Sequence, residues 1–396
     1  MGNYFFLQVF TVIFALSIAT TIFNKRILGF PQAIGVPIVS AIFVFILQWG
    51  ASLLSGNQFI TINIHNIEEA VRHIDFYDFL INGVICFILT SSALKFKVSD
   101  LRSYWKPISI LASIALVLCA VFFGVVLYGY QFIIGQHVDL LVLLLLGAAL
   151  GATDPIGIKG VLSSVRAPHH LMVKLEGESL FNDAMCIALF MTLLNVLQGE
   201  NFTVMGVLQT LLYEIFVAVI IGWAFGLGIL RLLRGKHEME SLILTTALLA
   251  CGSYLVALFA HASAPIACVI GGLIVGNKWK EILQEREIRE VNHFWHTVEG
   301  IINSFLFTLI GLELFILDLS FSLIFGGIVA FIILHASRFA ANYLSFAFFP
   351  SFRKKSYNGS LAILSWGGVR GGISLALILA VANVPELSEY SSILIG

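Results

Sequence analysis

Apolar residues form runs long enough to cross a lipid bilayer from one end of this 396-residue chain to the other. A transmembrane helix needs about 20 consecutive, mainly apolar residues, and short polar stretches separate the runs. A further apolar stretch, from Leu387 to Gly396, would span only roughly 15 Å as a helix, so we expect a truncated thirteenth span. The pattern predicts twelve complete spans: residues 4–23, 33–54, 76–96, 107–129, 138–161, 173–198, 204–230, 240–260, 264–277, 297–317, 321–348 and 357–381.

The composition agrees with a polytopic, all-α membrane protein. Hydrophobic residues make up 59% of the chain and charged residues 11%, whereas soluble proteins have about 25% charged residues. The net charge of −1, without a basic run, gives no reason to expect a nucleic-acid partner. The five cysteines lie in apolar segments without metal-ligand spacing, so we interpret them as small apolar fillers and expect no cofactor. Residues 4–23 lack a basic start and read as a span rather than a cleaved signal.

The basic residues predict the orientation in the membrane. Of the 22 lysines and arginines, 19 fall in the loops that follow odd-numbered spans, and Arg72 alone falls in an opposite loop. Basic loops favour the cytoplasmic side. We therefore expect a multi-pass protein of the cell (inner) membrane with its N-terminus outside. The remaining two, Arg338 and Arg370, lie inside predicted spans.

An internal repeat relates the two halves of the chain. The segments FILTSSALKFKVSDL, from Phe87, and FLFTLIGLELFILDL, from Phe305, share five of fifteen positions. They pair the third span with the tenth, and this odd offset gives the two copies opposite orientations, as in secondary transporters. We expect one transmembrane domain over residues 1–396, with inverted repeats at about 1–198 and 240–396 that span 204–230 links.

The same offset pairs two spans that both contain helix breakers. The fifth span contains GATDPIG and the twelfth contains WGGVRGG. Interrupted helices at matching places in two repeats point to a substrate site. Asp154 before Pro155 predicts the start of a second half-helix, so the first should end near Gly151–Thr153. The freed carbonyl groups, including that of Thr153, would suit a cation.

Acidic residues are concentrated in the sixth span, in KLEGESLFNDAMCIALF. Ser179 and Asp183 are four residues apart and share one helical face, and Glu178 and Asn182 share the adjacent face. Asp183 should lie near the membrane midplane, where an ionisable group is a functional candidate. Glu176, at the helix start, is interpreted as structural.

Arg370 is predicted to balance one of these acids. It lies about halfway along the twelfth span, among glycines that permit close helix approach, and an isolated buried charge is very costly. We expect a Glu178–Arg370 ion pair, with the carbonyl end of its own half-helix as a compatible alternative for Arg370. Arg338 is interpreted as structural, either paired with a nearby acid or snorkelling.

These residues resemble those of the monovalent cation/proton antiporters, in the sodium/proton exchanger branch. The segments that carry the resemblance are ATDP, EGESLFNDA, WGGVRGGISLAL and FWHTVEGIINSFLFTLIGLEL. The resemblance implies an inverted-repeat antiporter fold with two crossed broken helices, a mobile core and a dimerising panel, hence a homodimer. It also implies that Asp183, with Thr153, Asp154 and Ser179, binds Na⁺ or H⁺, that Glu178 and Arg370 pair, and that Asn182 marks electroneutral exchange.

Two regions depart from this pattern or remain open. Some members carry a glutamate in the third helix, whereas this chain has ILTSSALKF, so polar groups there must come from Thr90, Ser91 or Ser92. His293 and His296, in the amphipathic stretch 278–296 that we expect on the cytoplasmic side, are weak candidates for pH sensing or metal binding.

The leading hypothesis is an electroneutral antiporter that exchanges one cytoplasmic Na⁺ or Li⁺ for one H⁺ by alternating access. A potassium/proton antiporter is the alternative within the class, because oxygen ligands suit several alkali cations. A cation channel and an intramembrane aspartyl protease using Asp154 and Asp183 are the alternatives from other classes. The transport hypothesis accounts for Asn182 and for the matched helix breaks, which a protease would not need.

Overall fold

The structure is a computed structural model, and it is all-helical over the residues that it describes. These residues are 5–53, 81, 83–135, 138–153, 168–199, 203–235, 238–313, 321–348, 360–368, 370, 371, 373, 374, 377 and 378. The α-helices are α1 (Phe5–Phe23), α2 (Gln32–Leu53), α4 (Ile85–Lys95), α5 (Val98–Ile110), α6 (Leu116–Ile134), α7 (Leu140–Ala149), α9 (His169–Leu197), α10 (Val204–Leu232), α11 (Met239–Phe259), α12 (Ala264–Lys278), α13 (Glu285–Glu313), α14 (Phe321–Phe348) and α15 (Ser360–Trp366). Short π-helical segments η1 (Asn24–Leu28) and η3 (Leu111–Ala115) and the 3-10 turn η4 (Trp279–Glu281) connect some of them.

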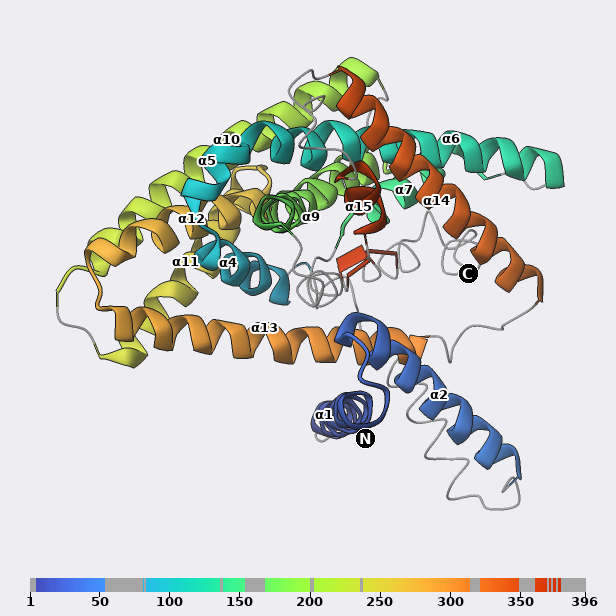
Figure 1. Cartoon of the computed structure of the whole chain (residues 1–396), viewed down its shortest axis with the longest axis horizontal. Coiled ribbons are helices and arrows are strands. Elements are labelled where there is room, and N and C mark those ends of the chain that lie inside the picture. Colours follow the sequence, from blue (N-terminus) through green and yellow to red (C-terminus); the bar gives the residue numbers. More distant parts are fainter. Residues whose placement is uncertain are drawn as a thin grey trace.

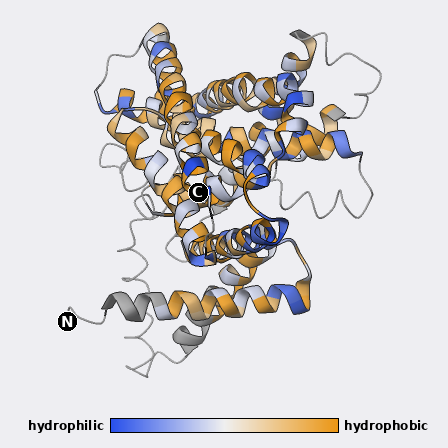
Figure 2. Cartoon of the chain, turned by 90° about the vertical axis from the view of Figure 1, so that its left-hand side faces the viewer, coloured by the Kyte–Doolittle hydropathy of each residue, from blue (hydrophilic) through white to orange (hydrophobic). Residues whose placement is uncertain are grey.

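Several helices have the length and composition of membrane spans. Within the described residues, six helical segments are long and apolar enough to cross a bilayer, and three shorter apolar helices accompany them. Hydrophilic residues gather near helix ends (Figure 2). Large apolar side chains face outward, with Ile133 82% and Phe259 77% exposed. Lipid would cover such a surface, so the chain is a polytopic membrane protein; the count of twelve spans stays a prediction.

Two boundaries differ from the sequence-based prediction. The fourth span was predicted to begin at residue 107, after a loop. The residues before it are helical instead, and α5, η3 and α6 form one continuous helical segment from Val98 to Ile134. Tyr104 has non-helical dihedral angles three residues before Pro107, as expected where a proline ring meets the preceding turn. The helix is therefore kinked here rather than started here.

The second difference concerns the amphipathic stretch 278–296, which was expected to be separate from the tenth span. The structure joins most of it to that span in the single helix α13. Ile288, Val291 and Trp295 recur at helical spacing and are buried in a cluster with α10, α11 and α12. This apolar stripe keeps the helix packed inside the protein, while His293 and His296 are exposed on α13.

The helices pack as two groups joined by α9. The first group contains α1, α2, α4, α10, α11, α12 and α13, and the second contains α5, η3, α6, α7, α14 and α15. Helix α9, seen nearly end-on near the centre of Figure 1, packs against α12, α10 and α4 of the first group and α7, α5 and η3 of the second. The residues of α9 are thus placed where the two groups meet.

Small residues allow the closest approach within the first group. A Cβ atom added to Gly272 of α12 would lie 2.6 Å from the Cβ atom of Ala93, and one added to Gly276 would collide with the Leu94 carbonyl group of α4. Glycine therefore lets the α4 and α12 backbones touch. Helix α4 also packs against α9 and against α13, where Ser91 contacts Trp295 and Glu299.

Candidate functional site

Helix α7 stops inside the protein and leaves its carbonyl end open. It is capped by Asp139, whose Oδ1 accepts from the Leu141 backbone N–H at 2.9 Å, and it ends at Ala149. Gly151 and Thr153 are buried and non-helical, which places the predicted break at GATDPIG. Asp154 and Pro155 lie outside the described residues. The last carbonyl groups of a helix lack internal partners, and inside a membrane they must find others.

Helix α9 supplies part of those partners from a single face. Asn182 Nδ2 donates to the Gly151 carbonyl oxygen at 3.0 Å and to Thr153 Oγ1 at 3.2 Å. The Ser179 hydroxyl donates to the Thr153 carbonyl oxygen. The predicted site residues Thr153, Ser179 and Asn182 are therefore in direct contact. The grouping differs from the expected one, because Asn182 acts with Ser179 rather than with Glu178.

Cys186 extends this face by one turn. Its Sγ donates to the Ala148 carbonyl oxygen at 2.8 Å, and Ser179, Asn182 and Cys186 are separated by three and four residues, which aligns them on one side of a helix. Cys186 was interpreted as an apolar filler; it is buried, as expected, but its thiol also satisfies a helix-end carbonyl group. The spacing of Cys186 from Ser179 and Asn182 is the signal in the sequence that could have identified this role.

The segment that follows α15 contacts the open end of α7. Arg370 Nη1 donates to the carbonyl oxygens of Gly151 and Ala152 at 3.3 and 3.4 Å, and Ser374 Oγ donates to that of Ala152 at 2.8 Å. Both residues follow α15, which ends at Trp366, the first residue of WGGVRGG. Arg370 is thus held by a carbonyl end, though by that of α7 rather than that of its own half-helix.

The predicted ion pair between Glu178 and Arg370 is corrected by the structure. Glu178 Oε1 accepts from Arg338 Nη2 at 2.6 Å, and the two side chains are 3% and 7% exposed. Arg338, on α14, also donates to the Leu364 carbonyl oxygen at 3.2 Å. Arg338 was expected to pair with an acid or to snorkel, and its acid is Glu178. Spacing within α9 could not distinguish two arginines that arrive from different helices.

Gly368 makes room for this ion pair. A Cβ atom at Gly368 would lie 2.5 Å from Arg338 Nε and 2.6 Å from its Cζ. One turn further along α14, Asn342 Nδ2 donates to Ser365 Oγ at 3.0 Å. Helix α14 therefore holds α15 through two polar contacts, and the ion pair links α14 to α9.

We expect Gly368→Ala to destabilise the protein by about 1–3 kcal/mol, the usual cost of overpacking, because Arg338 cannot withdraw without losing Glu178. Thermal unfolding of the purified protein measures this effect. Gly326→Ala is the matched control, since a Cβ atom at Gly326 of α14 meets open space. Equal melting temperatures for the two variants would contradict the assigned crowding.

Asp183 lies on α9 directly after Asn182 and four residues after Ser179. It is half-buried, whereas Glu178, Ser179 and Asn182 are buried. A residue four positions from Ser179 shares its face, so Asp183 lies next to the open end of α7. The carboxylate is the member of this group that is partly accessible from outside the packed interior.

The third predicted span contributes a different contact. Ser91 Oγ donates to Glu299 Oε2 at 2.9 Å, and the same oxygen pairs with Lys95 Nζ at 2.7 Å. Thr90 and Ser91 are buried and Ser92 is half-buried. The carboxylate in this region therefore comes from α13, which the sequence analysis did not consider. Among the described residues, no group of three or more His, Cys, Asp or Glu side chains could hold a metal ion.

The apolar helices and the contacts between the end of α7 and the segment after α15 define a polytopic membrane protein. The family described as sodium/hydrogen exchanger, transmembrane, matches residues 12–395. The chain therefore belongs to the sodium/hydrogen exchanger family, and the resemblance found in its sequence is confirmed.

Curated relatives and solved structures agree with this assignment. The Na⁺/H⁺ antiporter NhaP of Pseudomonas aeruginosa is 34% identical over 380 residues, which cover 94% of this chain and 88% of that protein. The Na⁺/H⁺ antiporter NhaH of Halobacillus dabanensis is 30% identical over 329 residues, or 80% of this chain and 78% of that one. The sodium proton antiporter MjNhaP1 of Methanocaldococcus jannaschii has the same fold, with a TM-score of 0.75 at 17% identity over 99% of this chain and 94% of its own.

Proposed function

We propose that this protein is an electroneutral Na⁺/H⁺ antiporter that exchanges one cytoplasmic Na⁺ or Li⁺ for one H⁺. The observation that carries the proposal is the arrangement around α7: Ser179 and Asn182 hold its open end immediately beside Asp183. Family membership and the activities in the names of the antiporters from Pseudomonas and Halobacillus support it.

Asp183 is proposed as the carrier group. A carboxylate binds either a proton or an alkali cation, so the two ions compete for one position. Occupancy by one excludes the other, and exchange follows without a separate coupling device. Asp183 is half-buried, and the proposal requires a water-filled path through which both ions reach it.

The neighbouring oxygen atoms are proposed to complete the sodium site. A hydroxyl has one hydrogen to donate and two lone pairs to accept with, and a carbonyl oxygen also has two lone pairs. The bond from Ser179 to the Thr153 carbonyl oxygen therefore leaves both groups able to bind a cation. These are hard oxygen donors of the kind that alkali cations prefer. Asp154, one residue further on, is proposed as another ligand.

The remaining groups are proposed to keep fixed charges during the cycle. Asn182 is a neutral amide engaged with the α7 end, and Arg370 supplies a permanent positive charge at the same carbonyl groups. Glu178 is neutralised by Arg338. Only Asp183 then alternates between its two ions, and one Na⁺ replaces one H⁺ with no net charge moved.

Alternating access is proposed to use the two helix groups. They meet through α9, which carries Asp183, so a movement of the second group against the first would open the site to one side and then the other. The proposal includes inverted repeats over residues 1–198 and 240–396, crossed broken helices at the fifth and twelfth spans, and a homodimer. It also places the protein in the cell membrane with its N-terminus outside.

Electroneutral exchange is tested by clamping the membrane potential. Full-length protein in sealed proteoliposomes should move protons when Na⁺ or Li⁺ is added, as followed with an internal pH dye. A potassium diffusion potential of about 100 mV applies roughly 2.3 kcal/mol per elementary charge, and it should leave the initial rate unchanged. The same assay also tests potassium/proton exchange when K⁺ is added in place of Na⁺ and the imposed potassium gradient is left out.

Sodium uptake that follows the sign of the potential, with no pH gradient present, would contradict electroneutral exchange and indicate a channel or electrogenic transport. Empty vesicles and vesicles with a proton ionophore give the background for both readings.

A further inference from the structure

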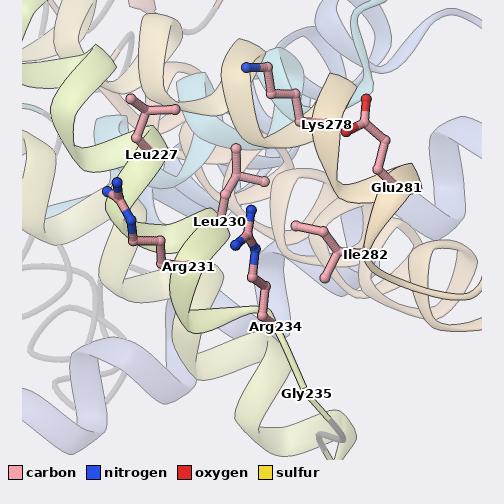
Figure 3. A pocket seen from close by; sticks show the side chains of 8 residues that line it. All are labelled: Leu227, Leu230, Arg231, Arg234, Gly235, Lys278, Glu281 and Ile282. Atoms are coloured by element: carbon pink, nitrogen blue, oxygen red, sulfur yellow. The ribbon is translucent and has the colours of Figure 1, made fainter.

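A basic pocket lies away from the candidate ion site, at the ends of two helices of the first group. It has a volume of about 480 Å³ and is lined by eight residues, none of them from the ion site. Figure 3 shows Arg231 and Arg234 at the end of α10 and Lys278 at the end of α12, with Glu281 beyond it. The lining residues are Leu227, Leu230, Arg231, Arg234, Gly235, Lys278, Glu281 and Ile282.

The charge of this pocket is not balanced by its own residues. Three cationic side chains face a single carboxylate, and all four are exposed. None of the four belongs to an ion pair within the part of the chain that the structure describes. Cations at helix C-termini do complement the helix dipole. That role needs one cation for each helix and does not require three around one hollow.

One wall of the pocket continues into an apolar surface. Leu227 lines the pocket, and Phe216, Ile220 and Trp223 precede it on α10 at intervals of three and four residues, on the same face. These three side chains are 67%, 49% and 56% exposed. The stripe ends at Arg231, four residues after Leu227. An exposed apolar face that continues into a basic pocket offers a binding surface for each part of an anionic phospholipid: the acyl chain on the apolar face and the headgroup in the pocket.

We propose that this pocket binds the phosphate headgroup of an anionic phospholipid whose acyl chain lies along Phe216, Ile220 and Trp223. Arg231 and Arg234 offer the planar donor groups that pair with phosphate oxygens, and Lys278 adds a point charge from the second helix. Basic pockets between transmembrane helices bind anionic headgroups in this manner. The apolar stripe is what distinguishes a lipid from a free anion, which would use the cations alone.

The test is quenching of tryptophan fluorescence by brominated lipid, with the purified, delipidated full-length chain in detergent. Brominated phosphatidylglycerol should quench at lower concentration than brominated phosphatidylcholine. Trp223→Phe should remove part of that quenching, because Trp223 borders the proposed chain position. Arg231→Gln together with Arg234→Gln should weaken the apparent affinity for phosphatidylglycerol on the order of 30-fold, at about fivefold for each basic residue.

The matched control is Arg286→Gln together with Arg289→Gln. Both residues lie on α13, with side chains 81% and 72% exposed, and both pair with glutamates four residues away. This variant should bind the lipid like the parent. Equal quenching by the two lipids, unchanged affinity in the Arg231/Arg234 variant, or full quenching after Trp223→Phe would each overturn the proposal.

Two further measurements exclude other occupants. Inorganic phosphate at the same concentration should neither displace the lipid nor raise the melting temperature, and a clear effect of phosphate would assign the pocket to a free anion. If the oligomer dissociates when Trp223 is changed while lipid affinity stays the same, a second copy of this chain covers the α10 face and the lipid assignment is wrong.

Discussion

Asp183→Asn is expected to reduce sodium-dependent proton exchange to the level of empty vesicles while the protein still folds. Asparagine has nearly the same shape as aspartate, but its amide does not release a proton and carries no charge to hold Na⁺. The variant therefore cannot trade one ion for the other at this position. Because Asp183 is half-buried rather than buried, we expect the melting temperature to change little.

The measurement is the rate of internal pH change after Na⁺ is added to proteoliposomes that contain equal amounts of each variant. Asp139→Asn is the matched control. Asp139 caps the start of α7 at the opposite end from the open carbonyl groups, and asparagine caps helices as well as aspartate does. The control should transport like the parent. If Asp183→Asn vesicles still change pH on sodium addition, Asp183 is not the carrier.

Much of the fold could be predicted because hydrophobic length and helix breakers are local properties. Seven predicted spans correspond closely to single helices, and α14 has the predicted bounds of 321–348. The break at GATDPIG was predictable because glycine weakens a helix and a proline removes a backbone donor from its interior. The continuation of residues 285–296 into the tenth span as one helix, α13, was not predicted. The charged residues near its start resemble a loop, and the sequence does not show which helices its apolar stripe packs against.

The candidate site was predictable in its members but less so in its contacts. Thr153, Ser179 and Asn182 are in contact, since the end of α7 needs partners and α9 carries donors, although Asn182 was expected on the face of Glu178. The predicted partner of Glu178 was wrong, because helical periodicity places a residue on one face of its helix but does not show which other helix packs against that face. The same limit applies to Ser91, whose acidic neighbour Glu299 comes from a helix more than 200 residues away in sequence.

The ion pair between Glu178 and Arg338 predicts the largest effect on stability. Breaking a buried pair by removing one partner typically costs about 3–5 kcal/mol, because the other charge is stranded. We expect Glu178→Gln and Arg338→Met each to destabilise the protein in this range. Together they should cost less than the sum of the two, with a coupling of about 1–3 kcal/mol. Unfolding of the purified proteins in detergent, followed by circular dichroism, gives these differences.

The parallel cycle with Arg370→Met decides which arginine is the partner. Arg370 donates to the carbonyl oxygens of Gly151 and Ala152 rather than to Glu178, so its coupling to Glu178 should be clearly the smaller of the two. The half-exposed pair of Lys95 and Glu299, with side chains 31% and 16% exposed, serves as a control and should couple by less than about 1 kcal/mol. A stronger coupling of Glu178 to Arg370 than to Arg338 would restore the pairing expected from the sequence and show that the contact to Arg338 is secondary.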